Sequence, residues 1–176
     1  MSGFWIGLAA GIVLAIIAFL VIYILLKRGA ICLPGLHGEG LYHKVLVASV
    51  GQVFSERSLY TAVGVVARRG LVETLYVLEI PLDHPLGVAP EEGLNKGMEA
   101  LDMAARWGGY HGVRFLPRLE KVRMGSKAIL DLQRKEGFDL VVMDLGLDER
   151  GNKDIRKIAE YVRERAGCTV LLISGG

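Results

Sequence analysis

The sequence predicts an α/β fold with a five-stranded parallel sheet and helices on both faces, preceded by one transmembrane helix. Two observations predict it. An apolar run of 23 residues without charge or proline covers Phe4–Leu26. From residue 43 onward, short apolar segments alternate with segments whose apolar residues recur every three or four positions. The second pattern is typical of repeated βαβ units, whose strands are parallel.

The run 4–26 is long enough to cross a bilayer. As a helix it would extend about 35 Å, against a hydrocarbon core of about 30 Å. A cleaved signal peptide would need a basic start and a shorter apolar stretch, which this sequence lacks. Lys27 and Arg28 follow the run directly. We therefore expect a single-pass protein of the cytoplasmic membrane, with its N-terminus outside and its C-terminal domain in the cytoplasm.

This reading divides the chain into an anchor at 1–28, a glycine-containing linker at 29–42 and one domain at 43–176. Within the anchor, small residues recur every fourth position and share one helix face: Gly3, Gly7, Gly11 and Ala15. Such a face lets two helices approach closely in lipid. We expect it to pack against an integral membrane partner, and the sequence leaves open whether that partner is a second copy.

The elements of the domain follow in order. Strands are predicted at 44–50, 71–80, 113–123, 138–145 and 168–174, and helices at 55–70, 90–109, 125–135 and 154–165. The strands are nearly continuous apolar runs, as in buried parallel sheets. Ser55 is the expected N-cap of the first helix and Gly70 its end. Pro90 suits the first turn of the second helix.

Composition excludes several classes of function. The net charge is +2 with acids and bases mixed, so no basic tract suggests nucleic acid. Cys32 and Cys168 are expected to be reduced thiols in the cytoplasm. The histidines lie in connectors, and Ser126 is expected to cap a helix. We expect no enzyme activity, no metal and no cofactor. Trp107 and Tyr110 could lie in the core or form an exposed contact, and the core is favoured.

Five stretches of the domain resemble the universal stress protein family. They are Val45-Leu-Val-Ala-Ser49, Ser55-Glu-Arg-Ser-Leu59, Val122-Arg-Met-Gly-Ser-Lys-Ala-Ile-Leu130, Phe138-Asp-Leu-Val-Val-Met143 and Ala166-Gly-Cys-Thr-Val-Leu-Leu-Ile173. The resemblance covers roughly 43–176. It implies a five-stranded α/β sandwich related to adenine-nucleotide-binding folds. It also implies that dimers can pair through the last strand, here Cys168–Ser174.

Some members of that family bind ATP through a loop with the pattern Gly-x2-Gly-x9-Gly-Ser/Thr after the fourth strand. This chain has Asp144, Leu147 and Lys157 at the three glycine positions. Starting instead from Gly146 leads to Glu149 and Ala159. The acid that nucleotide-binding members carry after the first strand is also missing, because Val50-Gly51-Gln52 stands there. ATP binding is therefore not expected.

Four residues remain as a candidate ligand crevice at the switch point of the sheet: Ser49, Gly51, Asp144 and Gly146. Asp144 is the best single site candidate, with a simple loop-start aspartate as the alternative. The sequence favours a non-catalytic accessory or regulatory subunit that docks by its transmembrane helix on a larger transporter, respiratory or photosynthetic assembly. A small-molecule sensor at the membrane and a homodimeric membrane-localised stress protein are the alternatives.

Overall fold

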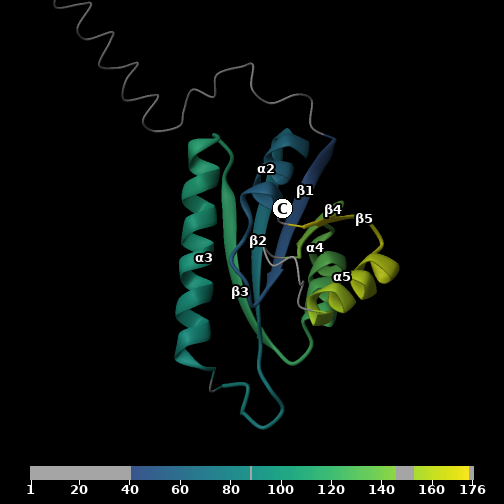
Figure 1. Cartoon of the computed structure of the whole chain (residues 1–176). Coiled ribbons are helices and arrows are strands. Elements are labelled where there is room, and N and C mark those ends of the chain that lie inside the picture. Colours follow the sequence, from purple (N-terminus) through teal and green to yellow (C-terminus); the bar gives the residue numbers. More distant parts are fainter. Residues whose placement is uncertain (1–40, 88, 146–152, 175–176) are drawn as a thin grey trace, which may run out of the picture. The chain divides into compact units, whose positions relative to one another are not determined.

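The computed structural model describes residues 41–87, 89–145 and 153–174, and the side chain of Lys153 is not described. Strands and helices alternate through this part of the chain (Figure 1). In order they are β1 (Tyr42–Val50), α2 (Glu56–Val65), β2 (Val66–Glu79), α3 (Glu91–Tyr110), β3 (Phe115–Val122), α4 (Gly125–Glu136), β4 (Leu140–Asp144), α5 (Lys153–Arg165) and β5 (Thr169–Ile173). The predicted βαβ alternation is confirmed.

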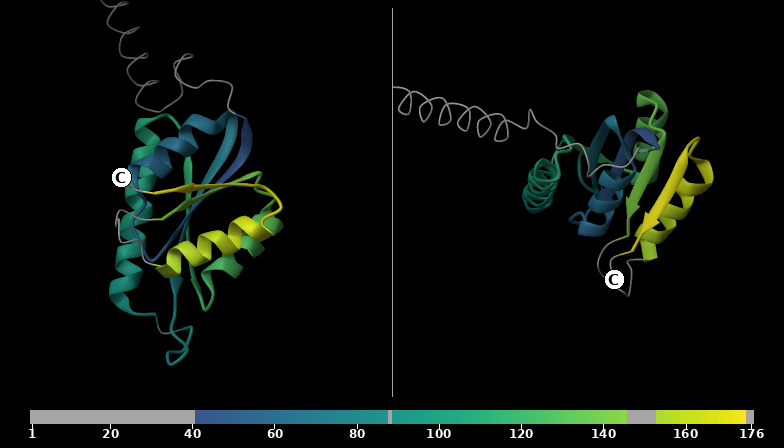
Figure 2. Two further views of the ribbon diagram at one scale, coloured as in Figure 1. Left: turned by 45° about the vertical axis from the view of Figure 1, so that its right-hand side comes forward. Right: turned by 90° about the horizontal axis from the view of Figure 1, so that it is seen from above.

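The five strands form one parallel sheet in the order β3-β2-β1-β4-β5. The chain builds outward from β1 to β3 on one side, then crosses back and adds β4 and β5 on the other. The reversal of direction lies between β1 and β4, where parallel α/β folds open a crevice at the carboxyl ends of the strands. The strands and their covering helices are seen from two further directions in Figure 2.

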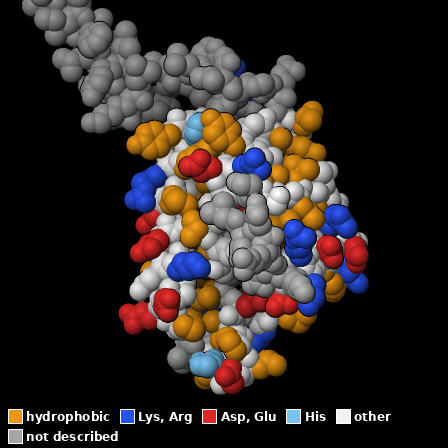
Figure 3. Space-filling model, viewed as in Figure 1, with side chains coloured by type: hydrophobic (Ala, Val, Ile, Leu, Met, Phe, Trp, Pro, Cys, Tyr) orange, Lys and Arg blue, Asp and Glu red, His pale blue; other side chains and the backbone are white. Residues whose placement is uncertain are grey.

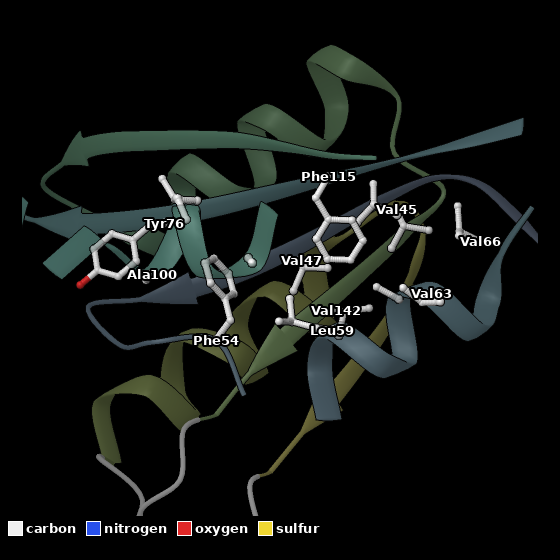
Figure 4. Packing of buried hydrophobic residues seen from close by; sticks show 14 of the residues in the cluster. Val45, Val47, Phe54, Leu59, Val63, Val66, Tyr76, Ala100, Phe115 and Val142 are labelled. Carbon is white, nitrogen blue, oxygen red and sulfur yellow. The ribbon is translucent and has the colours of Figure 1, made fainter. Parts of the chain in front are cut away.

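Helices cover both faces of the sheet, as the sequence predicts. The helices α2 and α3 pack on one face, over a cluster that includes Val45, Leu59 and Phe115 (Figure 4). The helices α4 and α5 pack on the other face, over Leu46, Ile129 and Val162. Residues 45–48 of β1 are fully buried. A strand covered on both faces cannot alternate polar and apolar side chains, which explains its continuous apolar sequence.

The boundary between the first helix and the second strand differs from the prediction. The helix ends at Val65 rather than Gly70, and Val66 is already extended, with φ −72° and ψ 135°. The strand β2 therefore follows α2 without a loop. A Cβ on Gly70 would lie 2.9 Å from the carbonyl oxygen of His43, so this glycine permits a close approach of two strands. It does not end a helix.

Two helix ends also differ from the sequence analysis. The helix α3 continues past Gly108 and Gly109 to Tyr110. The N-cap of α4 is Met124, so Ser126 lies inside the helix and does not cap it. The first amide of that helix, from Gly125, instead donates to the Glu79 carboxylate at 2.6 Å.

The predicted transmembrane segment 4–26 and the helix-packing residues Gly3, Gly7, Gly11 and Ala15 lie outside the described residues. Among the helices that the structure does describe, none is both long and apolar enough to cross a bilayer. The predicted anchor and its packing face therefore stay predictions.

Candidate functional site

Three of the four predicted crevice residues meet at the carboxyl ends of β1 and β4. Ser49 is the next-to-last residue of β1, Gly51 follows that strand, and Asp144 is the last residue of β4. The two strands are direct neighbours in the sheet. The fourth residue, Gly146, lies outside the described residues. The three residues therefore lie at the same edge of the sheet, because parallel strands end at a common edge.

Asp144 is buried, with 1% of its surface exposed. Its Oδ2 atom accepts a hydrogen bond from the backbone N–H of Ser55 at 2.5 Å and another from the Ser58 hydroxyl at 2.8 Å. Both donors belong to the start of α2. A carboxylate is stabilised there because a helix N-terminus carries unsatisfied N–H groups and the positive end of the helix dipole.

The same helix start is capped by its own side chains. The Ser55 hydroxyl accepts the backbone N–H of Ser58 at 3.3 Å, and the Ser58 hydroxyl lies 2.8 Å from the Ser55 carbonyl oxygen. Ser55 is thus the predicted N-cap, and the prediction is confirmed. Together with Asp144 these groups form a buried polar network that ties β4 to α2 across the switch point.

Ser49 and Gly51 shape the loop after β1. The buried Ser49 hydroxyl donates to the Gln52 carbonyl oxygen at 2.7 Å. Gly51 has φ +66°, a left-handed conformation that favours glycine, and its N–H donates to the Val77 carbonyl oxygen at 3.0 Å. Both residues therefore have a role in holding the turn. No ligand is needed to account for their polar groups.

A second polar arrangement, which sequence reasoning missed, lies on the face covered by α4. Glu73 of β2 is 9% exposed and forms an ion pair with Arg118 of the edge strand β3 at 3.0 Å. Burial raises the pKa of the Glu73 carboxyl, and the Arg118 guanidinium opposes that rise. An acid within an otherwise apolar strand indicates a buried polar contact. The sequence does not identify its partner, because Arg118 lies 45 residues away.

An open groove of about 460 Å³ lies beside this pair, between β3 and α4. Its charged lining contains Arg118, Arg123, Lys127 and Lys135 against Glu120 and Asp131, so cations outnumber acids. Two of these cations are already engaged, because Arg123 donates to the carbonyl oxygens of Ile80 and His84 and Arg118 pairs with Glu73. Across the part of the chain that is described, no group of three or more His, Cys, Asp or Glu side chains could hold a metal ion.

Trp107 and Tyr110, left open by the sequence, have different environments. Trp107 is partly buried against the core and packs edge-on to Tyr60 of α2, with ring centroids 5.1 Å apart. It also lies 4.1 Å from the His111 ring. Tyr110 is 90% exposed, so the core prediction is wrong for this residue.

Comparison with known proteins bears on the fold. No family model matches the sequence, and no curated protein matches it significantly. Among solved structures, a universal stress protein family member from Burkholderia pseudomallei is 26% identical, with a TM-score of 0.56 over 75% of this chain and 96% of that one. The fold is that of the universal stress proteins.

Two further solved structures support the same fold. The universal stress protein from Archaeoglobus fulgidus in complex with dAMP is 18% identical, with a TM-score of 0.55 over 76% of this chain and 98% of that one. A universal stress protein from Lactobacillus plantarum is 17% identical, with a TM-score of 0.57 over 74% and 97%. These matches show a common fold over about three quarters of the chain.

Proposed function

We propose that this chain is a membrane-anchored, non-catalytic module with a universal stress protein fold, which regulates or assists an integral membrane partner and does not use ATP. The proposal that the chain does not use ATP is supported by the buried carboxylate of Asp144 at the N-terminus of α2. The proposal that it is anchored beside a membrane partner is supported by the uncharged segment 4–26 and its row of small residues.

The position of Asp144 argues against a phosphate in the same crevice. Helix N-termini at the carboxyl edge of a parallel sheet are the usual anion sites, because their N–H groups point at the ligand. Here the Ser55 N–H and the Ser58 O–H already donate to the chain's own carboxylate. A phosphate brought within about 4 Å of that carboxylate would be repelled by roughly 4 kcal/mol per unit charge in a partly desolvated site.

The proposal that the chain does not bind adenine nucleotides is tested by calorimetry and thermal melting of the full chain with millimolar MgATP and with AMP. We expect neither measurable heat of binding nor a shift in melting temperature. The dAMP found with the Archaeoglobus fulgidus protein makes deoxyadenosine monophosphate a third ligand to include. A melting shift of several degrees with any of the three would contradict this half of the proposal.

The proposal of an integral membrane partner is tested by purifying the full chain in mild detergent. Proteins that co-purify in stoichiometric amounts are then identified by mass spectrometry. Gly7→Leu or Gly11→Leu should release the partner, because a large side chain separates helices that pack through small residues. Val13→Leu is the matched control, since it adds bulk to the same segment away from the row of Gly7 and Gly11. Equal partner yield from all three variants would exclude this docking face.

A homodimer is a second candidate, favoured by the edge strand β5. Its apolar residues Val170, Leu171, Leu172 and Ile173 are only partly buried, although each would be covered in an inner strand. An apolar edge with free backbone groups is a template for pairing with another strand. A second copy of the chain, joined edge to edge, would continue the sheet and cover these side chains.

A further inference from the structure

The edge of the sheet at which all five strands begin, together with the adjoining helix ends, is here called the amino edge. Its exposed residues include Leu41, His43, Lys44, Arg68, Arg69, Tyr110 and Arg114. Leu41 precedes β1, the arginine pair lies in the first residues of β2, and Arg114 directly precedes β3. The pairing of Lys44 with Leu71 and of Val72 with Phe115 brings these strand starts to one end of the domain.

Aromatic side chains form one corner of the amino edge. The rings of Tyr60, Trp107 and His111 contact one another with centroid separations of 4.1–5.1 Å. Tyr60 is 60% exposed and Tyr110 is 90% exposed. Figure 3 shows hydrophobic side chains and a histidine gathered at the top of the view, where α2 and α3 end. Tyrosine and tryptophan combine an apolar ring with a polar tip, which suits the water–lipid interface.

Three arginines of the amino edge, at the starts of β2 and β3, are not explained by ion pairs or helix dipoles. Arg68, Arg69 and Arg114 form no ion pair with any residue in the described ranges. They also do not complement helix dipoles, because they lie on strand starts and the last turns of α2 and α3 contain no basic residue. By contrast, Arg134, Lys135, Arg163 and Arg165 lie in the last turns of α4 and α5, where a cation is expected.

Acidic groups at the amino edge are few and engaged locally. The Asp139 carboxylate accepts the backbone N–H groups of His43 and Lys44 at 2.8 and 2.9 Å. Glu164 forms an ion pair with Arg165. Glu136 is the remaining acid there, at the end of α4. The opposite edge is more acidic, since it carries Glu56, Asp83, Glu91, Glu92, Asp144 and Asp154.

The chain enters the domain at the amino edge. Fourteen residues, 27–40, separate the apolar segment from Leu41, and they could span at most about 50 Å if fully extended. Lys27 and Arg28 directly follow the apolar segment. A tether of this length keeps a surface at a high effective concentration beside the bilayer. The chain that leaves the anchor therefore enters the domain at the amino edge, which carries the exposed arginines and tyrosines.

We propose that the amino edge docks on the anionic lipid headgroups of the membrane that anchors the chain. Arginines pair with lipid phosphates, and the exposed rings of Tyr60 and Tyr110 lie among the headgroups. The inference rests on the anchoring part of the proposed function, but it does not require the protein partner. Because surface charges are screened beyond about 10 Å at 0.1 M salt, the docking is salt-sensitive.

The experiment uses the full chain in lipid nanodiscs. The sequence contains two tryptophans, so Trp5→Phe leaves Trp107 as the single donor for energy transfer to dansyl-labelled lipid headgroups. We expect greater transfer in nanodiscs with phosphatidylglycerol than in pure phosphatidylcholine. High salt should remove the difference. Equal transfer in the two lipids at low salt would overturn the proposal.

A matched pair of triple variants separates this surface from net charge. Arg68→Gln, Arg69→Gln and Arg114→Gln together should lower the transfer to its phosphatidylcholine value. Lys121→Gln, Lys127→Gln and Arg156→Gln remove the same charge from exposed residues elsewhere and should leave it high. An equal loss in both variants would contradict a role for the amino edge. Circular dichroism confirms that both variants are folded.

Failure of anchoring is distinguishable from failure of docking. If the full chain does not enter nanodiscs, the anchoring part of the proposed function is wrong. The amino edge is then tested by co-sedimentation of the full chain with phosphatidylglycerol vesicles at low and high salt. Salt-sensitive sedimentation that the first triple variant abolishes supports the inference, and sedimentation unaffected by that variant overturns it.

Discussion

Asp144 gives the clearest prediction for a single residue. Asp144→Ala would leave the Ser55 N–H without its buried acceptor, while the Ser58 O–H would keep only the Ser55 carbonyl oxygen. We expect the free energy of unfolding to fall by about 1–3 kcal/mol, because an unpaired buried polar group is costly. Asp144→Asn keeps an acceptor oxygen and should lose less. Urea unfolding monitored by circular dichroism checks both values, and an unchanged midpoint for Asp144→Ala would contradict the structural role.

Glu73 gives a prediction about pH. Burial raises the pKa of its carboxyl above the ordinary value of 4.5, so the folded state binds this proton more readily than the unfolded state. Its contribution to stability therefore declines as pH rises from about 4.5 through the raised pKa. Glu73→Gln removes that decline, and the stability of the variant relative to the parent should increase from pH 4.5 to pH 7.

The measurement is urea unfolding of both proteins at several pH values in that window. Asn95→Gln is the control, because it introduces the same side chain at an exposed position of α3 without removing a titratable group. Its stability difference from the parent should stay flat over the same window. A difference between the Glu73→Gln variant and the parent that is constant with pH would show that the carboxyl does not titrate as described.

At the scale of residues, the sequence predicts the strand end at which a residue lies better than it predicts the side chains that the residue contacts. Asp144, Ser49 and Gly51 could be located at one edge because strand ends follow from the apolar pattern. That Asp144 is buried against Ser55 and Ser58 could not be deduced, because 86 to 89 residues separate the partners. The Glu73–Arg118 pair was missed for the same reason, since its partner depends on the order of strands in the sheet.

At the scale of elements, two adjacent glycines of α3 give a matched test. A Cβ on Gly108 would lie 2.8 Å from the Val113 carbonyl oxygen and 2.9 Å from the Phe115 ring, whereas one on Gly109 would meet nothing within 4 Å. Gly108→Ala should destabilise the domain by about 1–3 kcal/mol, because the helix must move away from β3. Gly109→Ala should be neutral or slightly stabilising. Thermal unfolding of the two variants checks the contrast.

The boundary of α2 shows where sequence patterns become ambiguous. Val63, Val66 and Ala67 continue a helical stripe, yet Val66 already belongs to a strand. The same run of apolar residues satisfies both periods, and Gly70 resembles a helix end. The register of β1 against β2 decides the matter, since Tyr42 pairs with Val66 while Lys44 pairs with Leu71. This irregularity is a long-range feature that local pattern does not contain.

At the scale of the whole molecule, the exposed edge of β5 leads to a prediction about assembly. If two copies pair through this strand, the full chain in detergent should have the mass of a dimer by light scattering. Leu171→Lys should shift it to a monomer, because a lysine on an edge strand opposes pairing. Lys157→Gln on the exposed surface of α5 is the control. A monomeric parent protein would remove the homodimer from the candidate functions.

The direct junction between α2 and β2 has a mechanical consequence. The helix α2 is about 15 Å long, holds Asp144 through Ser55 and Ser58 at its start, and presents Tyr60 to the aromatic corner one turn later. No loop separates its end from β2, so α2 cannot tilt without moving the start of that strand. A displacement of α2 as a rigid body would therefore move both the start of β2 and the hydrogen bonds of Asp144.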